Sequence, residues 1–354
     1  MIDTLLGRIK KLRITKELKS LEMLPINSLG VWLTKRCNAN CFFCPVVHSK
    51  SKQDDLSLIE IDRIAKQISS IYPDIQSISF SGGEPLLRKD IKDILVIFKN
   101  YFRNVKFILY TNGILFDSIG DLLESFDNIS ISFHSISKYE EIFGVRFGPE
   151  RVIKNIENLS EDIKKKIELS VGISHINCQD FDEVLSFAQD TGINRINLFP
   201  IRYDFDKSYS LSSNYRIIHE SINWKSVFEI VKRFDNKLTI IPCIHNLKKL
   251  ASVYERQTEW QFPCRSPLHR MVVDYSARIR LCCGNQPPIG DVFSLDLKNL
   301  VQNTIVQEIL SNAINRTGVC KYCPFSIDPC FICSYRKHIS KVRQGIGEVF
   351  KQNK

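Results

Sequence analysis

Six apolar segments of strand length alternate with helical patterns between residues 31 and 235 of this 354-residue chain. The strand-like segments are rich in Val, Ile, Phe and Leu and are expected at 31–35, 75–80, 105–110, 128–133, 166–175 and 194–200. Helical patterns are expected at 57–71, 88–102, 117–125, 150–165, 179–190 and 213–234. Because a helix returns the chain for parallel pairing of successive strands, this alternation predicts an α/β fold with a parallel sheet.

Composition places the chain among globular proteins without a membrane span. Apolar residues make up 44% and charged residues 25%, and no run of eighteen apolar residues occurs. The first 24 residues mix Leu and Ile with Lys and Arg and contain no apolar signal core. Twelve Cys residues without an export signal favour metal binding over disulfides and a reducing cytoplasmic location. The net charge of +10 comes from scattered Lys and Arg, which does not favour a nucleic-acid partner.

Three Cys residues fall within eight positions of the segment TKRCNANCFFCP, directly after the first expected strand. Cys37, Cys41 and Cys44 have the spacing CxxxCxxC, which can wrap three thiolates around one inorganic centre. A structural zinc site is the alternative, but it needs a fourth ligand, and the next Cys is Cys178. Iron–sulfur clusters are normally held by four Cys, so three predict a [4Fe-4S] cluster with one iron open to an outside ligand.

The second expected strand is followed by Ser81-Gly82-Gly83-Glu84-Pro85. A CxxxCxxC loop after the first strand and Gly-Gly-Glu after the second resemble the radical S-adenosylmethionine (SAM) superfamily. The resemblance implies a partial (β/α)6 TIM-type barrel with chemistry at the carboxyl ends of the strands. It also implies that the open iron binds SAM and that the reduced cluster cleaves it to a 5′-deoxyadenosyl radical, which removes a hydrogen atom from the substrate. Flavodoxin or ferredoxin is the expected reductant.

The resemblance also assigns SAM contacts to individual residues. Phe43 precedes the third Cys and would lie near the adenine, with packing in the core as the alternative. Leu198 could pack on adenine or belong to the barrel core, and Arg146 resembles the Arg that meets the SAM carboxylate, although Arg151 is close enough to take that place. His134, after the fourth strand, is either a substrate contact or a satisfied polar residue. The expected SAM-binding residues are Phe43, Gly82, Gly83, Glu84, Asn112, Ser132, Arg146 and Leu198; no catalytic side chain is assigned.

A second group of seven Cys lies between Cys264 and Cys333. A Cys, a hairpin-like strand pair ending in Cys, a helix over 300–314 and a CxxC resemble the Twitch and SPASM extensions, which hold one or two auxiliary clusters. Zinc is the alternative, since paired CxxC units also bind zinc. The favoured assignment is one [4Fe-4S] cluster on Cys264, Cys282, Cys320 and Cys323, with Cys330 and Cys333 at a tail site for a second, and Cys283 could replace Cys282. The alternative is two clusters, on Cys264, Cys282 and Cys333 and on Cys320, Cys323 and Cys330, each set lacking one ligand. Ala277 stands where the family usually has Gly, which weakens the match to a full SPASM domain.

The expected domains are an N-terminal amphipathic helix and linker (1–30), the partial barrel (31–235), a connector (236–262), a Cys-rich auxiliary-cluster domain (263–340) and a basic tail (341–354). The expected function is a radical SAM enzyme that modifies a peptide or a sugar-like metabolite, with the auxiliary cluster assisting oxidation or binding substrate. Only about 30 residues precede the first strand, so a peptide enzyme of this type would need a separate leader-binding protein. The alternatives are radical modification of RNA and a non-catalytic metal-binding interaction protein.

Overall fold

The computed structural model describes most of the chain. The described residues are 11–18, 20–44, 46, 55–201, 222–255, 258, 263–282, 286–317 and 320. Cys323, Cys330 and Cys333, residues 213–221 of the expected helix at 213–234 and the basic tail lie outside them. In the described residues, no helix is long and apolar enough to cross a membrane.

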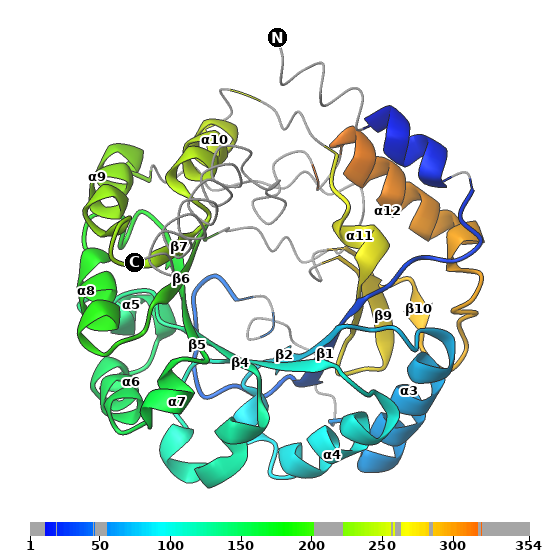
Figure 1. Cartoon of the computed structure of the whole chain (residues 1–354), viewed down its shortest axis with the longest axis horizontal. Helices are drawn as coiled ribbons and strands as arrows, with labels where there is room; N and C mark the ends of the chain where they lie inside the picture. Colours follow the sequence, from blue (N-terminus) through cyan, green and yellow to red (C-terminus); the bar gives the residue numbers. More distant parts are fainter. Residues whose placement is uncertain are drawn as a thin grey trace, which may run out of the picture.

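One curved sheet of ten strands forms the inner layer, and helices cover its outer face (Figure 1). The spatial order is β10-β9-β8-β1-β2-β3-β4-β5-β6-β7. Pairing is parallel from β8 through β1 to β7, and β8, β9 and β10 pair antiparallel. The strands are β1 (Ser28–Thr34), β2 (Ser77–Gly82), β3 (Lys106–Thr111), β4 (Asn128–Ser132), β5 (Ile167–Ile173), β6 (Arg195–Pro200), β7 (Thr239–Ile241), β8 (Arg270–Val273), β9 (Arg278–Leu281) and β10 (Gly290–Asp291).

This arrangement confirms the expected α/β fold with a mostly parallel, barrel-like sheet. Two parts of the sheet come from segments that the sequence pattern did not assign to it. The apolar stretch 238–241 of the expected connector supplies β7, and the hairpin of the Cys-rich segment joins β1 through β8. Both strands are short, so their periodicity alone does not reveal their partners.

Helices follow the expected pattern with two local differences, and the sequence pattern did not predict the helices at 139–143, 244–254 and 266–269. The α-helices are α3 (Leu58–Ile71), α4 (Ile91–Tyr101), α5 (Tyr139–Phe143), α6 (Gly148–Glu157), α7 (Glu161–Lys164), α8 (Asp182–Asp190), α9 (Trp224–Phe234), α10 (Ile244–Tyr254), α11 (Ser266–His269) and α12 (Thr304–Asn315); residues 11–18 are also helical. The 3-10 turns are η1 (Pro85–Leu87), η2 (Phe116–Ser118), η3 (Gly120–Ser125) and η4 (Leu300–Gln302).

The first difference is that segment 117–125 forms the 3-10 turns η2 and η3 instead of one helix. The second is that the expected helix 150–165 divides into α6 and α7. Ser160 is extended, and its hydroxyl accepts a hydrogen bond from the Ile163 amide, so it caps a new helix.

The two faces of the sheet differ in polarity, and this decides where a ligand can be held. Residues such as Val31, Phe80 and Ile131 are fully buried on the face that packs against the helices. The opposite face carries small polar side chains, including Ser79 and Ser130. The apolar core therefore lies between sheet and helices, while the inside of the partial barrel is polar.

The β8–β9 turn bears on the Ala277 departure noted in the sequence. Ala277 has φ 57°, in the left-handed region where a Cβ is unfavourable and Gly is preferred. The turn is held by Asp274, whose carboxylate accepts hydrogen bonds from the amides of Ser276 (3.0 Å) and Arg278 (3.1 Å). The chain thus keeps a Gly-type backbone conformation with Ala in it.

Candidate functional site at the carboxyl edge of the sheet

The loop that carries Cys37, Cys41 and Cys44 leaves the carboxyl end of β1. All three Cys side chains are half-buried. The loop is fastened to α5 by two backbone hydrogen bonds, from Asn40 N to Phe143 O (2.8 Å) and from Phe42 N to Ile142 O (3.3 Å). The three Cys therefore sit on a loop supported by the fold.

The thiols of this loop influence one another's ionisation. Burial, together with the neighbouring Glu84 and Cys44, raises the pKa of the Cys37 thiol to about 11. Burial also raises the pKa of Cys41, as do the charges of Cys44 and Cys37. Three thiolates in this position need a compensating cation, which is the requirement that an iron centre meets. Among the described residues, no group of three or more His, Cys, Asp and Glu side chains is arranged to hold a single metal ion.

Gly82 and Gly83 allow the end of β2 to approach the base of this loop. The Gly83 amide donates to Thr34 O (2.7 Å), and the Glu84 amide donates to Arg36 O (2.8 Å). A Cβ at Gly83 would lie 2.1 Å from Arg36 O, and one at Gly82, where φ is 127°, would lie 2.4 Å from Thr34 O. Since these neighbours are backbone atoms, only Gly fits at both positions.

The Glu84 side chain joins β2 to β3. It is 1% exposed and accepts hydrogen bonds from the Thr111 hydroxyl (2.8 Å), the Asn112 amide (2.8 Å) and the Leu86 amide (3.1 Å). Burial raises its pKa to about 7, although the three hydrogen bonds act in the opposite direction. Its carboxyl group therefore accepts hydrogen bonds from two backbone amides and one hydroxyl of the protein itself.

Asn112 lies beside this carboxylate and reaches back to the Cys loop. Its Nδ2 donates to Asn38 Oδ1 (2.7 Å), and its Oδ1 accepts from the Ile114 amide (3.0 Å). Sequence reasoning missed Asn38: its position between the first two Cys places it in the Cys loop but does not reveal its bond to Asn112.

Aromatic rings surround His134 near the third Cys. The ring centroid of His134 lies 5.4 Å from that of Phe43, 4.8 Å from Phe143 and 6.0 Å from Phe199. His134 is 2% exposed, and its Nδ1 accepts from the Gly172 amide (3.0 Å). Burial lowers its pKa to about 4, so the ring is neutral at pH 7. The Phe43 ring therefore packs at a tilt against a buried, neutral imidazole.

The other expected SAM contacts differ in burial and in their partners. Ser132 ends β4 and is half-buried. The Arg146 side chain is 82% exposed and pairs with Glu140 (3.2 Å), while Arg151 pairs with Asp117 (3.0 Å). Leu198 is 1% exposed, alternates with half-exposed neighbours on β6 and belongs to the apolar core on the helix side. The structure therefore brings Phe43, Gly82, Gly83, Glu84 and Asn112 together around the Cys loop, whereas the Arg146 side chain is exposed and Leu198 faces the helices.

The Cys-rich segment also brings distant Cys residues together. Cys264 and Cys320 are buried in one small cluster with Ala313, and the Cys264 amide donates to Ala313 O (2.9 Å). Cys282 is buried at the end of β9, and its amide donates to Arg270 O at the start of β8 (3.0 Å).

A buried polar network supports this second Cys group. Gln286 is 2% exposed; its Nε2 donates to Cys320 Sγ (3.5 Å), and its Oε1 has no hydrogen-bond partner among the described residues. Arg280 donates to Gln286 O (2.9 Å) and, through Nε, to the fully buried carboxylate of Asp274 (3.1 Å). A buried N–H donor to sulfur, next to buried thiols, fits a centre held by Cys ligands.

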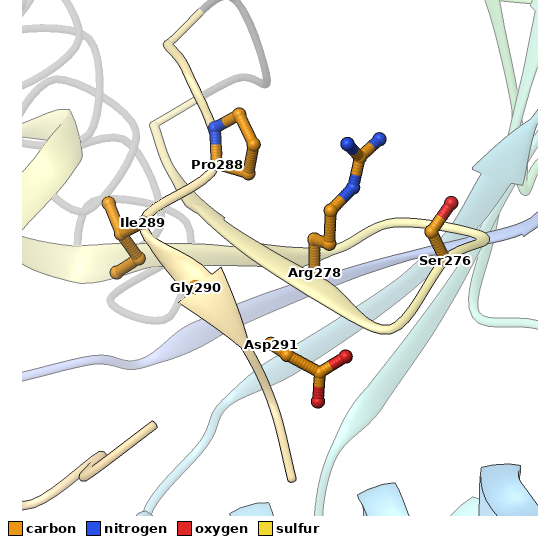
Figure 2. A pocket seen from close by; sticks show the side chains of 6 residues that line it. All are labelled: Ser276, Arg278, Pro288, Ile289, Gly290 and Asp291. Atoms are coloured by element: carbon orange, nitrogen blue, oxygen red, sulfur yellow. The ribbon is translucent and has the colours of Figure 1, made fainter. Parts of the chain in front are cut away.

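A shallow hollow lies nearby, at the β9–β10 edge (Figure 2). Arg278 and Asp291, which are paired in the antiparallel register, lie on its wall with Ser276, Pro288, Ile289 and Gly290. None of the residues described around the Cys37 loop lines this hollow.

Comparison with known proteins shows which family has this arrangement. Residues 32–188 match the Radical SAM superfamily. A probable GTP 3′,8-cyclase of Sulfurisphaera tokodaii is 30% identical over 223 residues, which cover 61% of this chain and 66% of that protein. A probable GTP 3′,8-cyclase of Methanocaldococcus jannaschii is 30% identical over 193 residues, covering 52% of this chain and 63% of that protein. The chain thus spans slightly less than two thirds of the length of these relatives.

Solved structures of low sequence identity share the fold. Streptococcus suis SuiB bound to S-adenosylmethionine has a TM-score of 0.62 and 18% identity, covering 84% of this chain and 71% of SuiB. The protein anSMEcpe with bound AdoMet has a TM-score of 0.59 and 15% identity, covering 81% of this chain and 83% of that one. The architecture expected from the sequence is therefore confirmed by proteins with little sequence in common.

Proposed function

We propose that this member of the radical SAM superfamily is an enzyme that cleaves S-adenosylmethionine reductively at a [4Fe-4S] cluster held by Cys37, Cys41 and Cys44. The cluster and SAM would supply a 5′-deoxyadenosyl radical that abstracts a hydrogen atom from the substrate. The observation that carries the proposal is the joining of three strand ends: the Cys loop after β1, Gly82-Gly83 after β2 and Asn112 after β3 form one hydrogen-bonded unit.

The residues of the protein would bind and orient the cofactor. The half-buried thiols of Cys37, Cys41 and Cys44 are the expected cluster ligands. Phe43 is held by His134, so its ring is in place to pack against a planar group beside the loop. The inner face of the sheet carries Ser130, whose hydroxyl has no hydrogen-bond partner among the described residues and would be available to a polar group of the substrate.

A second, auxiliary [4Fe-4S] cluster would be held by Cys264, Cys282 and Cys320 together with Cys323. The burial of Cys264 and Cys320 in one cluster with Ala313 and the Gln286 hydrogen bond to Cys320 support this assignment. An auxiliary cluster would either accept an electron from the product radical or bind the substrate.

Anaerobic reconstitution with iron and sulfide, followed by dithionite and SAM, tests the proposal. The wild-type protein should form 5′-deoxyadenosine, and a Cys41→Ala variant should not. Because uncoupled cleavage can proceed without substrate, the test does not depend on knowing the substrate. Wild-type protein that binds only zinc and forms no 5′-deoxyadenosine would refute the proposal.

Two candidate substrate classes follow from different observations. A peptide or a sugar-like metabolite is our expectation from the sequence, with a reductant such as flavodoxin or ferredoxin and, for a peptide, a separate leader-binding protein. The curated relatives favour a second candidate, GTP, since their names state GTP 3′,8-cyclase activity. Adding GTP to the reconstituted, reduced protein should increase 5′-deoxyadenosine formation and consume GTP if GTP is the substrate. If the uncoupled rate is unchanged, GTP is excluded and the peptide or metabolite class remains.

A further inference from the structure

Both chain neighbours of Cys37 are held by residues from other strands. On one side, Arg36 O accepts a hydrogen bond from the Glu84 amide (2.8 Å). On the other, Asn38 Oδ1 accepts one from Asn112 Nδ2 (2.7 Å). The backbone at Cys37 is therefore fixed from β2 on one side and from β3 on the other.

The hydrogen bond from Asn112 to Asn38, called the clamp below, is supported by further hydrogen bonds between buried groups. Glu84 Oε2 accepts from the Asn112 amide, and Glu84 Oε1 accepts from the Thr111 hydroxyl, both at 2.8 Å. Asn112 Oδ1 accepts from the Ile114 amide, so both ends of its side-chain amide are used inside the protein. Asn112 is 7% exposed. Buried hydrogen bonds of this kind leave little rotational freedom to the side chain that makes them.

We propose that Asn112 is a positioning residue that holds Cys37 through Asn38, and that it does not contact SAM. The inference rests on the proposed function, because Cys37 is taken as a ligand of the SAM-binding cluster. The alternative is the direct contact with SAM expected from family resemblance. The two roles differ in what an Asn112 variant loses, namely retention of the cluster or affinity for SAM.

The chain offers a closely matched control. Asn155 is also 7% exposed, and its Nδ2 donates to Gly113 O (2.9 Å) and Ile114 O (3.2 Å). It therefore supports the same turn after β3, and its side-chain amide donates to that turn and not to the Cys loop. An Asn155→Leu variant should lower the melting temperature of the protein as much as Asn112→Leu does, without freeing Asn38.

The experiment compares wild type, Asn112→Leu, Asn38→Ala, the double variant and Asn155→Leu after anaerobic reconstitution. The SAM-binding cluster is followed by the part of the reduced paramagnetic signal that changes when SAM is added. Its decay is measured in the presence of an iron chelator, and SAM affinity is measured on protein that retains the signal.

We expect Asn112→Leu and Asn38→Ala each to speed the decay about tenfold, roughly the effect of losing one buried hydrogen bond. The double variant should decay no faster than either single variant, because both remove the same contact. SAM affinity should change less than about twofold. A decay rate for Asn112→Leu equal to that of wild type or of Asn155→Leu would overturn the inference, as would an unchanged decay rate with a large loss of SAM affinity.

Failure of the proposed function has a different signature. In that case the wild-type protein gives no SAM-sensitive signal at all. The clamp is then measured by hydrogen exchange over residues 37–44 of the protein as isolated. Faster exchange in Asn112→Leu than in Asn155→Leu supports the clamp, and equal exchange refutes it.

Discussion

Glu84 and His134 should give the stability of this protein two opposing dependences on pH. Both side chains are almost completely buried, and both are held in their neutral forms over a wide range of pH. Burial raises the pKa of Glu84 from 4.5 to about 7 and lowers that of His134 from 6.5 to about 4. Between about pH 4.5 and 6.5 the fold therefore keeps uncharged two groups that the unfolded chain ionises in part.

The sign of each contribution follows from the direction of the pKa change. The stability contributed by protonated Glu84 is fully present below about pH 4.5 and is lost as pH rises through about 7. The stability contributed by neutral His134 is fully present above about pH 6.5 and is lost as pH falls through about 4. A tenfold change in proton affinity corresponds to about 1.4 kcal/mol, so each contribution changes by about 3 kcal/mol across its range.

The assay is urea unfolding of the anaerobically purified protein, followed by circular dichroism at several pH values between about 4 and 8. In wild type the two dependences largely cancel. The free energy of unfolding of Glu84→Gln, relative to wild type, should increase by about 3 kcal/mol as pH rises from about 4.5 to 7. His134→Gln keeps a side-chain acceptor for the Gly172 amide. The free energy of unfolding of this variant, relative to wild type, should decrease by about 3 kcal/mol as pH rises from about 4 to 6.5.

The test compares the curves of unfolding free energy against pH for wild type and for each variant. If the Glu84→Gln curve runs parallel to that of wild type, Glu84 is already ionised in the fold, and its three hydrogen bonds outweigh its burial. A parallel curve for His134→Gln would likewise mean that burial does not keep the imidazole neutral.

The remaining predictions concern close packing, buried charge and bound iron. Gly83→Ala should destabilise the protein by about 3 kcal/mol or more and reduce the iron bound per chain, because the new Cβ would meet Arg36 O. Gly30→Ala is the milder control, since its Cβ would meet only a Val272 methyl group, at 3.1 Å. Equal effects of the two substitutions would contradict this reasoning. Asp274→Ala should lower the free energy of unfolding by about 3–5 kcal/mol, measured by thermal or urea unfolding, because it leaves the Arg280 guanidinium buried without its carboxylate. A decrease under about 1 kcal/mol would show that this ion pair does not stabilise the fold. Removing iron with a chelator under anaerobic conditions should lower the melting temperature, and unchanged melting would argue against any metal centre.

The order of elements and the location of the Cys loop could be predicted from the amino-acid sequence. Strand-length apolar runs separated by helical patterns leave the parallel sheet as the main way to bury both, since helices must cover its apolar face. The sequence pattern also placed Cys37, Gly82 and Asn112 at successive strand ends, because neighbouring parallel strands end at the same edge of a sheet.

The contacts within that edge depended on the tertiary structure. Local sequence contains no signal that Asn112 bonds to Asn38, that Gly83 packs on Arg36 or that Leu198 faces the helices. The same holds for the short strands β7 and β8, whose pairing with β6 and β1 joins residues far apart in the chain. Periodicity reports which face of an element is apolar, whereas the partner of a given side chain depends on sheet register and curvature, which are set only when the whole chain packs.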